Sequence, residues 1–288
     1  MLDRKLALIL LIKNLTSKVD KMIIGGGMAF TFAKVGGANI GASLFDEEGA
    51  KLVPEILKAA KDANVEIILP VDFTVSSKFG EDGEIKEGVS IEEGVPEGFL
   101  GLDCGPKTNE LNVAAIEASK TIIWNGPMGV FEMEKFEKGT KVMMDAIVDA
   151  TKAGTTTVIG GGDTATACKK YKTEDKVTHV STGGGASLEL LEGKVLPGLA
   201  ALSDKPVAAL AVGGAEGGKL SKMSVGDLDV KGKRVLMRVD FNVPQDKADP
   251  SIITNTARID AALPTIKDLL ARGAKSVVCC SHLGRPNG

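Results

Sequence analysis

Short runs of valine and isoleucine recur along this sequence, and several of them stop at a cluster of glycines. The runs that end in glycine are 21–27, 121–129, 156–163 and 179–187. Three others, which end in polar residues, are 65–73, 233–242 and 276–286. Continuous apolar runs without alternation are typical of strands that are covered on both faces. We therefore expect parallel sheets.

Stretches with helical periodicity lie between these runs. One apolar face is predicted from Leu52 to Ala60, in a helix that ends near Asn64. A second helix is predicted to begin after Thr254 or Asn255 and to stop at Gly273, with a kink or split at Pro264. Strands that alternate with helices indicate an α/β fold with right-handed crossovers.

Two stretches break this alternation. Residues 79–99 are acidic and rich in turn residues, which predicts an exposed excursion. Residues 203–218 are rich in alanine and glycine, which predicts a linker. A length of 288 residues suits two domains, which we place at 1–202 and 219–288.

Composition excludes several classes of protein. A net charge of −3 argues against nucleic acid or a polybasic membrane contact as a partner. The longest apolar run, 6–12, is too short to cross a bilayer and lacks a signal-peptide cleavage site. The four cysteines show no zinc or disulfide spacing, which indicates a reducing interior, cytoplasmic or organellar.

Glycine at the carboxyl end of a parallel strand brings bare amides and a helix N-terminus up to a phosphate, although it also serves simple packing. Several such turns in one region predict an anion-binding rim. Two standard motifs fit less well. Gly213–Leu220 resembles a P-loop but has leucine at the magnesium-binding position, so the linker interpretation is favoured. Gly160–Ala165 fits a dinucleotide pattern, but Val180 stands where an acidic residue belongs.

Polar residues next to the glycines suggest chemistry. Asp163 could face a magnesium ion beside phosphates, or could simply be an N-cap. Thr164 is expected to cap the helix that follows. Glu132 could accept hydrogen bonds from ribose hydroxyls, or be an ordinary surface acid. His179 is expected to be structural.

The last 55 residues add positive charge at strand ends. Two guanidiniums and an imidazole that converge there could bind a small doubly anionic ligand, although each alone suits a solvated surface position. The residues concerned are Asp240, Asn242, Arg258, His282 and Arg285.

Taken together, the motifs resemble those of phosphoglycerate kinases. They are IIGGGMAFTF, LPVDF, LDCGP, WNGPMGVFE, GGGDTATA, HVSTGGGASLELLEGK with LPG, RVDFNVP and SHLGRPNG. The resemblance covers roughly 8–202 and 219–288. It implies a Rossmann-like nucleotide-binding domain followed by a partial acid-substrate domain. It also implies phosphoryl transfer between Mg-ATP and 3-phosphoglycerate in glycolysis, with small molecules as the partners.

The resemblance also implies roles for individual residues. Those implied for the nucleotide are Gly25, Gly26, Gly105, Gly126, Gly129, Val130, Glu132, Asp163 and Thr164, with Asp163 also meeting magnesium. Amides that would face the transferred phosphoryl group belong to Gly162, Gly184 and Gly185. Those implied for 3-phosphoglycerate are Asp240, Asn242, Arg258, His282 and Arg285, with Arg258 also neutralising charge in the transition state.

The order of the two parts is inverted relative to the family. We interpret the chain as the end of one kinase copy, a linker and the opening of a second copy, in preference to a circular permutant. A neighbouring kinase copy is then an expected partner. Leu8 stands at one of the family's phosphate-binding lysine positions, and Arg4 only approximates the other. A non-catalytic nucleotide-binding module is the main alternative, and an NAD-dependent oxidoreductase would rest on Gly160–Ala165 alone.

Overall fold

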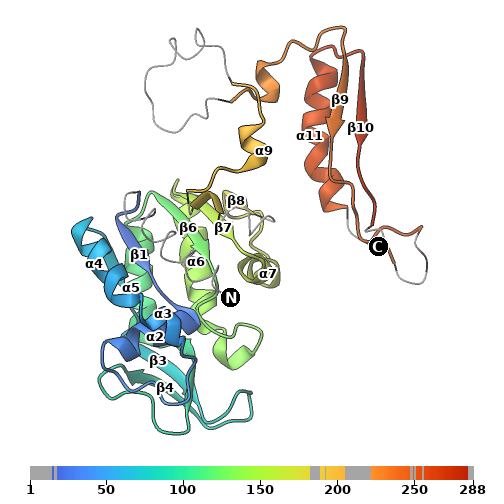
Figure 1. Ribbon diagram of the computed structural model, residues 1–288. Coiled ribbons are helices and arrows are strands. Elements are labelled where there is room, and N and C mark those ends of the chain that lie inside the picture. The colour runs from blue at the N-terminus through green and yellow to red at the C-terminus, as the bar shows by residue number, and fades with distance from the viewer. Residues whose placement is uncertain are drawn as a thin grey trace. The chain divides into compact units, whose positions relative to one another are not determined.

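The chain divides into two compact units, Met1–Leu196 and Pro197–Gly288, which we call unit 1 and unit 2 (Figure 1). The structure is a computed structural model. It describes residues 15, 18–181, 189–191, 193–204, 222–246, 249, 251–254 and 256–284. Most of the predicted linker, with Gly213–Leu220, lies outside these residues, so the domain limits stay a prediction.

Two parallel sheets carry most of the predicted strands of unit 1. Strand β1 (Lys21–Ile23) pairs with β2 (Glu66–Ile68). Strand β7 (Thr156–Gly160) pairs on one side with β6 (Thr121–Asn125) and on the other with β8 (His179–Val180). The expectation of parallel sheets in an α/β fold is confirmed here.

A third sheet of unit 1 is antiparallel, which the sequence analysis did not predict. Strand β3 (Asp72–Ser76) is fully buried and lies between β4 (Ile85–Ser90) and β5 (Leu100–Cys104). The predicted excursion at 79–99 therefore contains a strand. The turn closes because Ser77 N–H donates to the carbonyl of Glu84 at 2.9 Å, and this returns the chain against β3.

Helices connect and cover these strands. Helix α4 (Val53–Asp62) buries Val53, Ile56 and Ala60, as its periodicity predicts, and the chain turns at Asn64 with φ of 56°. Further helical segments of unit 1 include α2 (Gly26–Val35), α3 (Glu47–Ala50), α5 (Pro106–Glu117), η1 (Glu134–Phe136), α6 (Lys138–Lys152) and α7 (Gly162–Tyr171).

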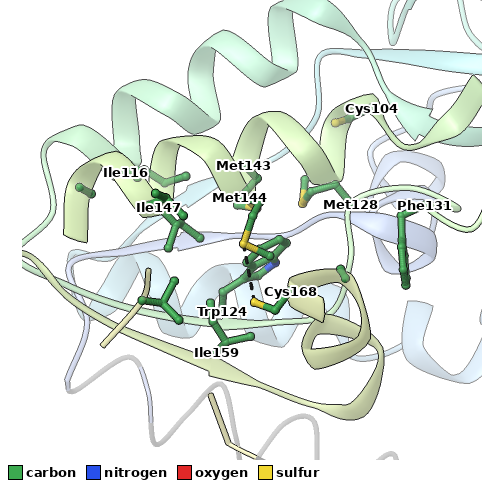
Figure 2. Packing of buried hydrophobic residues seen from close by; sticks show 14 residues of the cluster. Cys104, Ile116, Trp124, Met128, Phe131, Met143, Met144, Ile147, Ile159 and Cys168 are labelled. Atoms are coloured by element: carbon green, nitrogen blue, oxygen red, sulfur yellow. Dashed lines mark hydrogen bonds between the residues drawn. The ribbon is translucent and has the colours of Figure 1, made fainter. Parts of the chain in front are cut away.

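The main core of unit 1 lies between α6 and the sheet of β6 and β7 (Figure 2). Ile147 of α6 and Ile159 of β7 are both fully buried. Cys168 of α7 reaches across to Met144, with 3.7 Å between the two sulfur atoms. Burying each large apolar side chain contributes roughly 1.5–3 kcal/mol, so this core fixes the strand ends from which the glycine turns leave.

Unit 2 contains one strand–helix–strand repeat. Strands β9 (Arg234–Arg238) and β10 (Ser276–Cys280) pair in parallel, joined by α11 (Ala257–Ala271). Shorter elements are α9 (Pro197–Ala200) and η2 (Val225–Asp227). Leu236 and Val278 are 74% and 54% exposed, so the expectation that strands are covered on both faces is wrong in this described part of the chain.

Helix α11 corrects part of a second expectation. It is a single helix that runs through Pro264, so the predicted split is wrong, and the alternative of a kink stays a prediction. Pro264 removes only the hydrogen bond to the carbonyl of Asp260, and both residues are exposed, so water can satisfy that carbonyl. The N-cap is Thr256, not Thr254 or Asn255, and the chain leaves the helix at Gly273 with φ of 86°.

Candidate functional site

A cavity of about 310 Å³ lies in unit 1 beside the glycine turn that follows β1. Its wall includes Gly26 and Gly27 at the start of α2, Gly101 and Leu102 in β5, and 127–130 after β6. Aromatic rings complete it, from Phe30, Phe73 and Phe79. This volume is at the lower end of the range of small-molecule sites, and a mostly apolar lining suits a flat group with few polar atoms.

Glycine is required at Gly101 by a close approach. A Cβ atom there would overlap the ring of Phe30, which also packs against Phe73 with 4.7 Å between the ring centroids. Glycine inside a strand often marks such a contact. The paired rings of Phe30 and Phe73 therefore line one side of the cavity, and the ring of Phe30 lies directly against Gly101 of β5.

Buried polar groups hold the loop after β6 at the cavity wall. Val130 N–H donates to the carbonyl of Leu102 at 2.9 Å. Met128 N–H and Gly129 N–H both donate to the hydroxyl of Thr140, at 3.1 and 3.2 Å. Thr140 belongs to α6 and is fully buried, so one helix and one strand fix this loop.

Asp103 also lies at this wall. Its carboxylate accepts from Gly139 N–H at 2.7 Å and from Cys104 N–H at 2.9 Å. The residue is 3% exposed, and burial raises the pKa of Asp103 to about 6. The two N–H donors oppose that shift.

The turns after β6 and β7 leave the same sheet edge, because Asn125 pairs with Gly160 in the parallel ladder. Gly126, with φ of 102°, donates its N–H to the hydroxyl of Thr164 at 2.7 Å. Thr164 is fully buried, and the N-cap of α7 is Gly161. The expectation that Thr164 caps α7 is therefore wrong, since its hydroxyl ties one glycine turn to the next.

Asp163 and Gly162 occupy the first turn of α7 and are both exposed. A carboxylate in a first turn is favoured by the positive end of the helix, and a divalent cation or its phosphates can reach it from solvent. Asp163 is not the N-cap. Its side chain therefore remains available for a ligand.

Some of the residues predicted to bind the nucleotide line the cavity, and others do not. Gly26, Gly129 and Val130 line it, whereas Gly25, Gly105, Gly126 and Glu132 do not. Gly25 is the N-cap of α2, and Glu132 is exposed just beyond the wall loop. Gly184, Gly185 and Arg285 lie outside the described residues.

Gly105 has a local explanation. A Cβ atom there would overlap the carboxylate of Asp72, which is buried and accepts from Lys107 N–H at 3.0 Å and Thr108 N–H at 2.8 Å. Asp72 thus satisfies the first amides of α5 from a neighbouring strand. This contact accounts for the glycine without a ligand.

Unit 2 brings three of its predicted residues together. The guanidinium of Arg258 donates to the carboxylate of Asp240 at 3.1 Å and to the carbonyl of Asn242 at 2.7 Å. Asn242 N–H donates to Asp240 at 3.0 Å, and this bond, followed by the Arg258 charge, holds the pKa of Asp240 below its ordinary value. Asp240 and Arg258 are exposed, and their charges neutralise one another.

His282 lies near the same strand ends. Its Nδ1 atom is 3.2 Å from the guanidinium of Arg238, a residue at the end of β9 that the sequence analysis did not select. The side chain of Asn242 accepts from Gly284 N–H at 2.8 Å, so the segments after β9 and β10 are hydrogen-bonded to each other.

Among the described residues, no group of three or more His, Cys, Asp or Glu side chains is arranged to hold a metal ion. All four cysteines are free thiols, and Cys104 and Cys168 are buried. No helix in the described part of the chain is long and apolar enough to cross a membrane.

The sequence model of one family, described as phosphoglycerate kinase, matches residues 5–194 and 225–288. The chain belongs to the phosphoglycerate kinase family. A probable phosphoglycerate kinase of Caenorhabditis elegans is 66% identical over 194 residues, and human phosphoglycerate kinase 1 is 57% identical over 195 residues. Each comparison covers 67% of this chain but only 46% of the relative, so the chain matches about half the length of these curated relatives.

Solved structures support the phosphoglycerate kinase assignment and its Rossmann-like α/β fold. The phosphoglycerate kinase of Coxiella burnetii is 38% identical with a TM-score of 0.62, and that of Pyrococcus horikoshii OT3 is 28% identical with a TM-score of 0.55. Both comparisons cover 67% of this chain and 48% of the solved chain.

Several residues of the cavity were not predicted from the sequence. Besides Gly27, Gly101 and Leu102, the lining includes Leu44 and Phe79. Gly101 could have been found, because a glycine inside an apolar strand is itself a signal. Phe79 carries no comparable signal, since it lies in a stretch that reads as an exposed turn.

Proposed function

We propose that this chain serves phosphoglycerate kinase chemistry, the reversible transfer of a phosphoryl group between ATP and 3-phosphoglycerate, and that unit 1 binds the nucleotide. The observation that carries the proposal is the cavity of about 310 Å³ between Gly26, Gly101 and the wall loop 127–130. Family membership supports the choice of ligand. A purine base is flat and largely apolar on its faces, which suits an apolar slot between bare glycines.

With the base in the cavity, other residues would contact the ribose and the phosphates. Glu132, exposed beyond the wall loop, would accept hydrogen bonds from ribose hydroxyls. The phosphates would lie toward the start of α7, where Gly162 would offer its amide and the helix end favours negative charge. Gly184 and Gly185 would add amides. Thr164 would act through Gly126, because its hydroxyl is already bonded to that amide.

Asp163 would hold the magnesium ion that accompanies the nucleotide. Magnesium is commonly bound by one or two carboxylates together with substrate phosphates, and Asp163 offers one exposed carboxylate in the first turn of α7. The donor set fits an ion carried on phosphates and not one caged by protein alone. When bound, the ion would neutralise phosphate charge during transfer.

Unit 2 would contribute the acid substrate's anchors. Asp240, Asn242, His282 and Arg285 would bind 3-phosphoglycerate, and Arg258 would neutralise charge in the transition state. Arg258 is paired with Asp240 at 3.1 Å, so binding an anion would require the guanidinium to exchange or share that partner. We also propose a reducing, cytoplasmic setting, in keeping with four free thiols and a glycolytic family.

A second candidate is a non-catalytic Mg-nucleotide-binding remnant of the same family. The observation that favours it is coverage, because the matched region is 46% of the C. elegans relative. Both candidates predict nucleotide binding, and only the first predicts turnover.

Two measurements on the 288-residue chain separate these functions. Calorimetric titration with Mg-ADP should give saturable binding, and NAD should not compete. A coupled assay with ATP, magnesium and 3-phosphoglycerate should give turnover far below that of a full-length family member, because transfer needs a complete acid site. Binding without turnover would favour the remnant, and absence of ADP binding would contradict both.

A further inference from the structure

We propose that Asp103 is a positioning residue for the nucleobase, because its carboxylate braces the loop 127–130 that forms one wall of the cavity. This inference rests on the proposed nucleotide site. The base itself would touch Gly129 and Val130, and Asp103 would act through them.

The brace is a set of contacts around one buried carboxylate. One oxygen of Asp103 accepts from Gly139 N–H at 2.7 Å, in the first turn of α6. The other oxygen accepts from Cys104 N–H at 2.9 Å. A Cβ atom on Gly129 or on Gly139 would overlap the same carboxylate. The wall loop and the helix start therefore both lie directly against it.

The next residue of α6 completes the connection. Thr140 accepts from Met128 N–H and Gly129 N–H, at 3.1 and 3.2 Å. The turn of helix that Asp103 holds through Gly139 is thus the turn that holds the wall loop through Thr140. A shift of the helix start would move the loop with it, and a base slot depends on loop position to within about 0.5 Å.

The charge of Asp103 is poorly compensated. Lys138 of α6 is the cation that lowers its pKa, whereas Cys104 of β5 and Tyr171 of α7 are neutral groups whose own pKa values are raised, partly by Asp103. Asp72 of β3 adds negative charge next to Cys104. Burial is the largest effect, and it raises the pKa of Asp103 to about 6. The carboxylate therefore becomes protonated in mildly acidic solution.

Binding and stability should then respond to pH in opposite directions. Below about pH 6 the protonated acid becomes a weaker acceptor for Gly139 N–H, which loosens the wall and lowers base affinity. The folded-state pKa lies above the ordinary value of 3.8, so folding takes up a proton between these values. Asp103 itself therefore adds stability as pH falls through that window. A residue that only stabilised the fold would not lower base affinity while it raised stability.

The test uses the 288-residue chain and adenosine, which has no phosphate to titrate. Wild-type affinity should fall by about threefold or more between about pH 7.5 and about pH 5. Asp103→Asn should bind weakly and with no pH dependence across that range. Asp145→Asn, an exposed acid on α6, the helix whose start Asp103 contacts, is the matched control and should follow the wild type. Equal affinities or parallel pH profiles for wild type and Asp103→Asn would overturn the proposal.

A second measurement needs no variant. The backbone amide signals of Gly129 and Gly139 in the wild-type chain should shift together with pH, with a common midpoint near 6. Amides that do not titrate would overturn the brace, even if the Asp103→Asn protein failed to fold. If the wild-type chain bound neither adenosine nor ADP at any pH, the proposed nucleotide site would be overturned, and this inference with it.

Discussion

The polar residues of the two units differ in burial and in the kind of partner that they bind. In unit 1, Thr140 and Thr164 are fully buried, and their hydroxyls accept hydrogen bonds from the backbone of loops elsewhere in the chain. In unit 2, Asp240 and Arg258 are exposed and bind each other. A buried polar group with one geometry makes a rigid wall, whereas an exposed ion pair can exchange partners at little cost. Unit 1 is therefore preorganised, and unit 2 presents groups that still have to be arranged.

The largest expected difference between the units is in their apolar packing. Ile147→Ala in α6 should lower the free energy of unfolding by about 2–5 kcal/mol, because the side chain is fully buried in the unit 1 core. Leu236→Ala in β9 should change it by less than about 0.5 kcal/mol, because that side chain is 74% exposed. Denaturant unfolding, followed by Trp124 fluorescence and by circular dichroism, measures both. Equal losses would show that the sheet face of unit 2 is as well packed as the core of unit 1.

An intermediate effect is expected from the link between the two glycine turns. Thr164→Val keeps the shape of the side chain but removes the acceptor for Gly126 N–H, which should cost about 1–3 kcal/mol and weaken ADP binding. The measurement combines unfolding with an ADP titration.

Thr166→Val is the matched control on the same helix. Its exposed hydroxyl donates to the carbonyl of Gly162 within the same helix, four residues earlier, so its loss should leave ADP affinity nearly unchanged. If the two valine variants behaved alike, the turn after β6 would not depend on Thr164.

The smallest effect is expected in unit 2. Arg258→Gln should leave the unfolding midpoint unchanged, because the pair with Asp240 is exposed. The pKa of Asp240 should rise toward 3.8 but stay below it, since Asn242 N–H is the largest cause of its lowering and remains in place. Since the folded-state pKa of Asp240 lies below its ordinary value, the ionised carboxylate stabilises the fold at pH values above that ordinary value. Any such contribution to the free energy of unfolding is lost only as pH falls through the folded-state pKa.

Carboxyl chemical shifts across a pH titration measure this pKa, and Lys267→Gln on α11 is a matched exposed control. A marked loss of stability in Arg258→Gln alone would mean that the unit 2 cluster is a structural support comparable to those in unit 1.

Local patterns in the sequence predict much of the fold. The apolar runs give β1, β6, β7, β9 and β10, and the periodicity of Val53, Ile56 and Ala60 gives α4. Glycines at strand ends predict the turns at the sheet edge. These features depend on neighbours a few residues apart, which is the range over which periodicity carries information.

What the sequence analysis missed depends on distant partners. The hydroxyl of Thr164 binds an amide 38 residues earlier, and Asp103 binds one 36 residues later, so composition around either residue gives no sign of its role. The antiparallel pairing of β3 with β4 and β5 depends on a turn that reads as an exposed excursion. The resemblance implies a nucleotide role for Gly105, whereas the buried carboxylate of Asp72, 33 residues earlier in the chain, accounts for the glycine.

We infer that the start of α2, strand β5 and the wall loop together enclose one nucleotide base, and amide chemical shifts during a Mg-ADP titration of the 288-residue chain are the sharpest test of this inference. We expect the largest saturable shifts at Gly26, Gly101 and Gly129, which line the cavity from α2, β5 and the wall loop. Shifts confined to other regions, with these three amides unmoved at saturation, would contradict it.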